Sequence, residues 1–185
     1  MSLSDTIWWS KKARIHAEKR LSAHDLFSQL LLFWYSFFTV VVSILEIKSE
    51  SSNEYFVIVM VSLSILILCS SLFISSRRFQ ERATLLKQCY ESLGELEHKA
   101  KQQDVNINEL SELYKATLSS SENHQDIDFK LALVNEYMSS KAPEKDLSRQ
   151  PTKANFVEVT MHFLFTWLIR FAVFLFPFAV LFYLR

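Results

Sequence analysis

Two stretches of the sequence, 26–45 and 55–74, each run for about 20 residues without a charged side chain. An α-helix of about 20 residues crosses the roughly 30 Å hydrocarbon core of a bilayer. The short segment between the two stretches, 46–54, contains three Glu and one Lys. Two apolar runs joined by a short polar turn predict a helical hairpin through a membrane. Whatever else the chain does, it is expected to work at that membrane.

The composition of the whole chain favours an all-α fold. Half of the residues are hydrophobic and 22% are charged, so the two kinds must lie in separate blocks. With one Gly and three Pro, the chain has few residues that break helices or form β-turns. A formal net charge of zero argues against a general nucleic-acid-binding surface, so no direct binding of nucleic acid is expected.

Changes in composition divide the chain into five segments. They are an N-terminal amphipathic helix (1–25), a transmembrane hairpin (26–76, with spans 26–45 and 55–74), a cytosolic helical domain (77–140), a linker (141–155) and a C-terminal hydrophobic helix (156–185). Lys and Arg cluster on both sides of the hairpin, whereas its turn is acidic. Since loops rich in Lys and Arg stay in the cytoplasm, we predict a multi-pass protein with its N-terminus and central domain cytoplasmic and 46–54 outside.

The N-terminal helix has two possible positions. Its apolar side is formed by Ile7, Trp8, Ile15 and Leu21, and its other side is basic. Trp favours the headgroup layer and basic side chains are attracted to anionic lipid, so the helix is suited to lie on the inner leaflet. The alternative is an ordinary cytosolic helix that packs on the rest of the cytosolic domain.

The cytosolic segment shows a heptad-like repeat of apolar residues from Phe79 to Tyr114. Within it, Leu86, Leu93 and Leu96 are predicted to form a seam between copies of the chain. The polar sequence around Asp104 predicts a break, with Asn106 placed to cap the next helix. A further helix is expected from Asp126 to about Met138, with Ile127, Leu131, Val134 and Met138 on one face. The following linker, with two Pro and many charges, is expected to be irregular.

The C-terminal apolar segment is long enough to form a third span, from about 165 to 184. An Arg at the bilayer centre costs about 2.5–3.5 kcal/mol, but the apolar neighbours of Arg170 outweigh that cost. The alternative is an interfacial helix, or one buried in an oligomer. Arg170 is then either an anchor at the cytoplasmic interface or a charge that faces the interior of an oligomer.

Small hydroxyl residues in the first span lie on one stripe. Ser36, Thr39 and Ser43 are spaced three and four residues apart. Such side chains allow close packing and hydrogen bonds between helices, and they can also line a wet pore in an oligomer.

No pattern in the sequence indicates catalysis. One Gly excludes a phosphate-binding Walker loop, no HExxH motif occurs, and no His or Cys has the spacing of a zinc site. The five His residues are scattered, and the Glu residues near 91–97 share a solvated helix with basic residues. We therefore expect no enzyme, no cofactor and no catalytic or metal-binding residue.

Three stretches carry a family resemblance. The first, before the hairpin, reads Trp8-Trp9-Ser10-Lys11-Lys12-Ala13-Arg14-Ile15-His16-Ala17-Glu18-Lys19-Arg20-Leu21. After the hairpin come Arg82-Ala83, Leu86, Cys89, Leu93 and Leu96, and then Tyr114, Glu122-Asn123-His124, Asp126 and Asp128. In this order around two closely spaced spans, they resemble the SLATT family of bacterial membrane effectors over residues 7–140. The C-terminal segment resembles the extension of a subgroup found beside reverse transcriptases.

The resemblance implies a pore-forming effector of a bacterial antiphage or conflict system. Such an effector is silenced by a sensor partner, then oligomerises, permeabilises the inner membrane and arrests the infected cell. The implied partners are membrane lipid, further copies of the chain, and a reverse transcriptase or nucleotide-second-messenger system encoded nearby. Asn123, His124 and Asp126 would form a loop that either binds a partner or is structural.

Two other functions fit the same features. One is a non-conducting membrane anchor or scaffold that recruits a cytosolic sensor or reverse transcriptase. The other is a small constitutive channel subunit. An effector is expected to depolarise cells when its partner is missing or when it is triggered, whereas an anchor is not.

Overall fold

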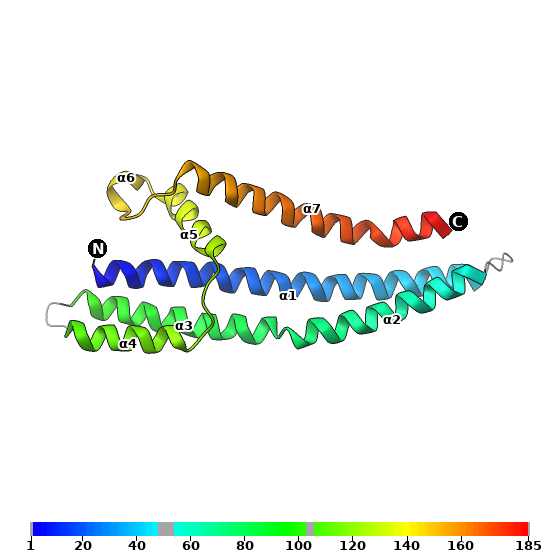
Figure 1. Cartoon of the computed structure of the whole chain (residues 1–185), viewed down its shortest axis with the longest axis horizontal. Coiled ribbons are helices and arrows are strands. Elements are labelled where there is room, and N and C mark those ends of the chain that lie inside the picture. Colours follow the sequence, from blue (N-terminus) through cyan, green and yellow to red (C-terminus); the bar gives the residue numbers. More distant parts are fainter. Residues whose placement is uncertain (1, 48–53, 103–105, 185) are drawn as a thin grey trace. The chain divides into compact units, whose positions relative to one another are not determined.

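The computed structural model describes residues 2–47, 54–102 and 106–184 (Figure 1). Its helices are α1 (Leu3–Ile47), α2 (Glu54–Ser76), α3 (Phe79–Ala100), α4 (Ile107–Ser119), α5 (Asp126–Ser139), α6 (Pro143–Asp146) and α7 (Lys153–Leu184). No strand occurs in these three ranges, which confirms the all-α prediction. Most of the acidic turn predicted outside the cell, 46–54, falls outside the described residues.

Within the described residues, three regions are helical for long enough, and apolar enough, to cross a membrane. They lie in α1, in α2 and in α7. The structure thus has a third candidate span, in α7, in addition to the two of the predicted hairpin. The chain divides into two compact units: unit 1 holds Met1–Ala23 and Phe79–Phe163, and unit 2 holds His24–Arg78 and Leu164–Arg185. The helices α1 and α7 each contribute to both units.

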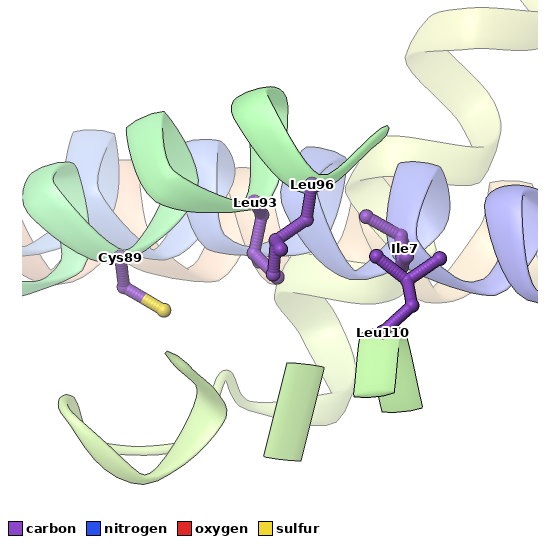
Figure 2. Close-up of a cluster of buried hydrophobic side chains, with 5 residues drawn as sticks. All are labelled: Ile7, Cys89, Leu93, Leu96 and Leu110. Carbon is purple, nitrogen blue, oxygen red and sulfur yellow. The ribbon is translucent and has the colours of Figure 1, made fainter. Parts of the chain in front are cut away.

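The core of unit 1 is built where the first part of α1 packs against α3 and α4. Figure 2 shows one cluster, formed by Ile7, Cys89, Leu93, Leu96 and Leu110. A second cluster joins Ala17 and Leu21 of α1 to Ala83 and Leu86 of α3. The first part of α1 therefore packs on α3 and α4 within unit 1. Each fully buried Leu contributes about 1.5–3 kcal/mol to such a core.

The predicted seam between copies is occupied within the single chain. Leu86, Leu93 and Leu96 are 0%, 0% and 6% exposed, because α1 and α4 cover this face of α3. A heptad pattern shows that a face is buried but not which helix buries it. The pattern is interrupted at the predicted break, since Ile107 at the start of α4 is 70% exposed, but the next residue of the series, Tyr114, packs against the same core. The break itself is confirmed: Asn106 caps α4 by accepting a hydrogen bond from Asn108 N at 3.1 Å.

The segment after α4 differs from the sequence prediction in two details. In α5 the buried residues are Asp128, Ala132, Leu133 and Val134. Met138, predicted on the packed face, is 75% exposed. The predicted linker 141–155 contains α6 and the start of α7, and Ser148 accepts a hydrogen bond from Trp9 Nε1 at 2.9 Å. The linker is therefore attached to α1 by a polar contact that its composition did not indicate.

In unit 2, α1 and α7 meet through aromatic rings. Trp34 stacks on Phe174 with 4.8 Å between ring centroids, and the Phe38 ring meets Phe178 edge-on at 5.4 Å. Trp34 and Phe38 are four residues apart, so both lie on one face of α1. Pairs of this kind contribute about 0.5–1.5 kcal/mol beyond the area that they bury.

Pro177 lies inside α7, where it interrupts the backbone hydrogen bonds of the helix. Because Pro has no N–H, the carbonyl of Val173, four residues earlier, loses its usual donor. Tyr35 Oη donates to Val173 O at 2.7 Å, and Trp34 Nε1 donates to Phe174 O at 3.2 Å. Side chains of α1 thus satisfy carbonyls beside the proline, as a helix without access to water requires.

Replacing Tyr35 by Phe is expected to destabilise unit 2 by about 0.6–1.7 kcal/mol, the range for hydrogen bonds between membrane helices. The measurement is reversible unfolding of the purified protein in mixed detergent micelles. In a Pro177→Ala background the restored N–H can bond to Val173 O, so the same change should have little effect. Equal losses in both backgrounds would show that the Tyr35 hydroxyl does not replace the missing backbone donor.

Candidate functional site

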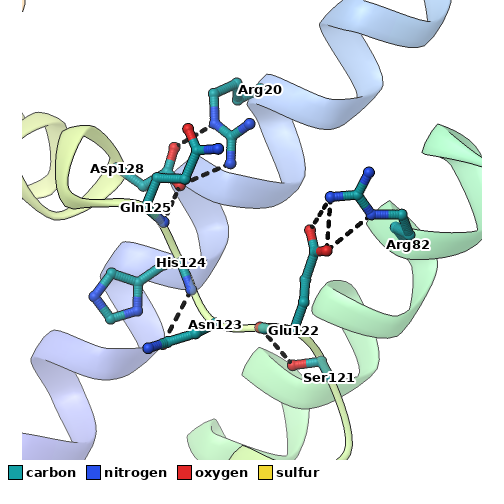
Figure 3. Close-up of polar contacts among 8 residues, drawn as sticks. All are labelled: Arg20, Arg82, Ser121, Glu122, Asn123, His124, Gln125 and Asp128. Carbon is teal, nitrogen blue, oxygen red and sulfur yellow. Dashed lines mark hydrogen bonds and ion pairs between the residues drawn. The ribbon is translucent and has the colours of Figure 1, made fainter. Parts of the chain in front are cut away.

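Two arginines hold the loop between α4 and α5, as Figure 3 shows. Arg82 of α3 donates to Glu122 through Nε at 2.8 Å and Nη2 at 2.9 Å. Arg20 of α1 donates to Asp128 through Nε at 2.8 Å and Nη2 at 3.0 Å. Both pairs are bidentate, which is the strongest and most directional arrangement that Arg forms with a carboxylate. We call residues 120–128, which are this loop together with the first turn of α5, the clamp loop.

The two ion pairs differ in burial. Asp128 is 0% exposed, and it also accepts a hydrogen bond from Gln125 N at 2.8 Å in the capping box of α5. Glu122 and Arg82 keep about a third of their side-chain surface in solvent. A buried charge whose partner is removed costs about 3–5 kcal/mol, whereas an exposed pair contributes at most about 1 kcal/mol. The Arg20–Asp128 pair is therefore the main attachment of the clamp loop.

The two arginines lie close in the sequence to the two ends of the hairpin. Arg20 lies three residues before α1 passes from unit 1 into unit 2, and Arg82 lies three residues after the chain re-enters unit 1 at Phe79. Between them the chain forms the hairpin of α1 and α2. The loop is thus bound to both segments by which the hairpin is joined to unit 1. A change in this loop would act on both segments at once.

The predicted interaction residues lie in or beside the clamp loop with mostly local contacts. Asn123 Oδ1 accepts from His124 N at 3.1 Å. Asp126, whose side chain is 78% exposed, pairs with Lys130 at 2.6 Å, and Lys130 also pairs with Glu158 of α7. Sequence reasoning missed the roles of Arg20, Arg82 and their carboxylates. The available signal was weak: each Arg stands next to the apolar positions of its helix, but its partner is 108 or 40 residues away.

Burial shifts the acid–base behaviour of two histidines in unit 1. It lowers the pKa of His124, Arg14 lowers it further, and Asp128 and Asp126 partly oppose this. Burial likewise lowers the pKa of His16, with Lys19 and Lys12 acting in the same direction and Asp128 and Glu136 against it. Both imidazoles are therefore held in their neutral form more strongly than in an unfolded chain.

Acidification is expected to destabilise unit 1 from about pH 6.5 downwards. Below that pH the unfolded chain takes up protons on His16 and His124 while the folded chain does not, so stability falls as pH falls towards the folded pKa values. Thermal unfolding from about pH 8 to about pH 5 tests this. A His16→Gln, His124→Gln protein should show a flatter profile. A wild-type protein that becomes more stable on acidification would contradict it.

The predicted pore-lining residues lie in unit 2. Ser36 is exposed, Ser43 is half-buried, and Thr39 Oγ1 donates to the backbone oxygen of Tyr35 at 2.8 Å. The Cζ atom of Arg170 lies 4.8 Å above the ring of Phe27, a cation–π contact between α7 and α1. The structure does not join Arg170 to the three hydroxyl residues in one site.

An apolar groove of about 520 Å³ opens between the three helices of unit 2. Its lining comes from all three and is almost entirely hydrocarbon: Leu31, Leu32, Tyr35, Leu66, Ile67, Cys69, Ser70, Phe73, Ile74, Val173 and Phe176. The Tyr35 hydroxyl at its wall is already bonded to Val173 O. The groove thus offers packing surface and few polar atoms.

Comparison with known proteins gives one match. A family model described as SMODS and SLOG-associating 2TM effector domain family 5 covers residues 1–183. No curated protein and no solved structure matches the chain. Across the parts of the chain that the structure describes, no group of three or more His, Cys, Asp or Glu side chains is placed to hold a metal ion.

Proposed function

The chain belongs to the SMODS and SLOG-associating 2TM effector domain family 5, and on this premise we propose that it is a membrane effector that forms a pore. Copies of the chain assemble in the bacterial inner membrane, and the assembly permeabilises that membrane during an antiphage response. The chain carries out no catalysis, and its effect on the cell comes from ion flow.

The observation that carries this proposal is the surface of unit 2. Large apolar side chains of α1, α2 and α7 are more than half exposed there, among them Phe33, Leu72 and Leu168. Lipid or further copies of the chain must cover these faces. Hydroxyl groups lie exposed on the same helices, at Ser36, Ser62 and Ser64. An oligomer that turns one of these hydroxyl-bearing helix faces inward would enclose a polar path with an apolar outside.

The clamp loop supplies a means of control in this proposal. While Arg20–Asp128 and Arg82–Glu122 are intact, the two segments that lead to the hairpin are bound to one loop. A sensor partner, either a reverse transcriptase or a nucleotide-second-messenger system, would keep the loop in this state or release it. Release would let the segments separate and the hairpins of neighbouring copies assemble.

The test is membrane potential in bacteria that express the chain alone, or together with its genomic neighbours. Expression alone, or a triggering infection, should depolarise the cells, and co-expression of the silencing neighbour should prevent it. Ser36→Leu should reduce the ion flux through purified protein in liposomes, whereas Phe33→Leu, an apolar exchange on an exposed site of the same helix, should not. Normal potential in every condition would favour a non-conducting anchor.

The proposed topology has its own test. In a protein without native Cys, a single Cys at position 51 should react with a membrane-impermeant thiol reagent added to intact spheroplasts. A Cys at position 119 should react only after the membrane is opened. The opposite pattern would place unit 1 outside the cytoplasm and rule out a cytosolic partner for the clamp loop.

A further inference from the structure

Arg14 is a buried cation without a partner. It lies in α1 with 2% of its surface exposed, and its Nε atom is buried with no hydrogen-bond partner. Among the described residues, its guanidinium forms no ion pair or hydrogen bond. By contrast, Arg20, six residues further along the same helix, donates hydrogen bonds to Asp128 through both Nε and Nη2. A buried charge without a counter-charge destabilises a fold, so an anion bound at Arg14 would stabilise this one.

His124 supplies a second nitrogen in the same region. Its Nδ1 atom is buried and has no partner, although the backbone around it is ordered by Asn123 in Figure 3. The ring of Phe129, next to Asp128, lies 6.2 Å from that of His124 and 6.1 Å from that of Trp9 in α1, and Asp128 itself pairs with Arg20. The segment that carries His124 therefore contacts α1 at residues before and after Arg14, and the charge of Arg14 acts on His124 accordingly. The two residues come from different elements, α1 and the clamp loop. The two unpartnered nitrogens therefore lie in one region of unit 1, although their residues are far apart in the sequence.

The surroundings are more positive than negative. The His124 ring lies 6.2 Å from the ring of Phe129, and the guanidinium of Arg149 lies 5.4 Å from that same ring. The two carboxylates that act on His124 are already engaged, Asp128 with Arg20 and Asp126 with Lys130. A further anion would therefore meet little opposing charge at Arg14.

We propose that Arg14 and His124 form a binding site for an oxyanion of the phosphate class. A guanidinium presents parallel N–H groups that match two oxygens of a phosphate, and an imidazole N–H can donate to a third. Sulfate shares this geometry and serves as a second probe. The phosphate group can belong to a free phosphorylated compound or to the headgroup of an anionic lipid.

One consequence rests on the proposed function. An anion held between α1 and the clamp loop adds a third attachment of that loop to the helix that carries Arg20. Its binding would favour the clamped state and so oppose pore assembly. The binding site itself does not depend on pore formation, and it is tested without cells.

The test is thermal unfolding of the full-length protein in neutral detergent, titrated with inorganic phosphate against chloride at constant ionic strength. The wild type should show a saturable rise in Tm. Arg14→Gln should have a higher Tm than the wild type without phosphate, because it removes an unpaired buried charge. The same variant should bind phosphate roughly 10- to 100-fold more weakly, the loss expected for charged hydrogen bonds. Lys19→Gln, which removes an exposed cation of the same helix, should respond as the wild type does.

Nanodiscs separate the two sources of phosphate. If the site takes a free compound, inorganic phosphate raises Tm equally in phosphatidylcholine and phosphatidylglycerol nanodiscs. If it takes a lipid headgroup, the wild type but not Arg14→Gln is more stable in phosphatidylglycerol, and added phosphate has no further effect there. The proposal is overturned if the wild type responds to neither probe, or if Lys19→Gln loses as much affinity as Arg14→Gln. Intact phosphate binding with no depolarisation of cells would count against the pore alone.

Discussion

Asp128→Ala is expected to destabilise unit 1 by about 3–5 kcal/mol, the cost of leaving one partner of a buried ion pair alone. Asp128 is fully buried, so its removal deprives the Arg20 guanidinium of both hydrogen bonds and Gln125 N of its acceptor. The measurement is chemical unfolding of the purified protein, followed by circular dichroism. If the clamp loop controls assembly, the variant should also depolarise cells without a trigger.

A matched control lies two residues away. Asp126→Ala removes a carboxylate from the same helix, but that side chain is 78% exposed and its pair with Lys130 spans one helical turn. Such pairs contribute about 0.3–0.5 kcal/mol. A double change, Arg20→Met with Asp128→Leu, should recover much of the lost stability, because no charge is then left unpaired. Equal small losses for Asp126→Ala and Asp128→Ala would refute a main attachment at Asp128.

Leu93→Asp is the second change with a large expected effect. Leu93 is fully buried beside Ile7, Cys89 and Leu110, so the change removes a core side chain and places a carboxylate among apolar atoms. Removing a core Leu costs about 2–5 kcal/mol by itself, and the charge adds to it. Unit 1 should lose its protection against proteases, while unit 2 remains in the membrane fraction.

The outcome for Leu93→Asp also tests the assignment of this face of α3 to the interior of unit 1. If it is the interior of unit 1, the helical signal and protease resistance fall in the monomer. If it is a seam between copies, unit 1 stays folded and only assembly is lost. Leu85→Asp is the control, since Leu85 lies on the same helix with 41% of its surface exposed and should tolerate a charge.

The sequence was sufficient for the elements whose signal is local. The absence of charge over 26–45 and 55–74 indicates two apolar helical stretches, which lie within α1 and α2, and Asn106 marks the start of α4. The apolar C-terminal segment, 156–185, predicts a helix long enough to span, and α7 begins three residues earlier, at Lys153. Each of these features is determined by neighbours along the chain.

Contacts between segments that are distant in the sequence could not be predicted. The burial of Leu93 was foreseen but not its partner, because Ile7 lies 86 positions earlier and any apolar face would fit. The Arg20–Asp128 pair joins residues 108 positions apart, and no periodicity links them. The linker looked irregular because its Pro residues and charges say nothing of the Trp9 side chain that reaches Ser148.

Pro177 has a consequence for how α7 finds its place beside α1. Within lipid, apolar side chains have no strong preference for each other over acyl chains, so a smooth apolar helix could slide or rotate along its neighbour at little cost. The proline leaves polar atoms at one height of α7, and Tyr35 and Trp34 bond to the carbonyls of two successive residues there. Moving α7 by a single residue, about 1.5 Å, would pull both donors from their acceptors. A residue known for breaking helices thus fixes the vertical register of one membrane helix against another.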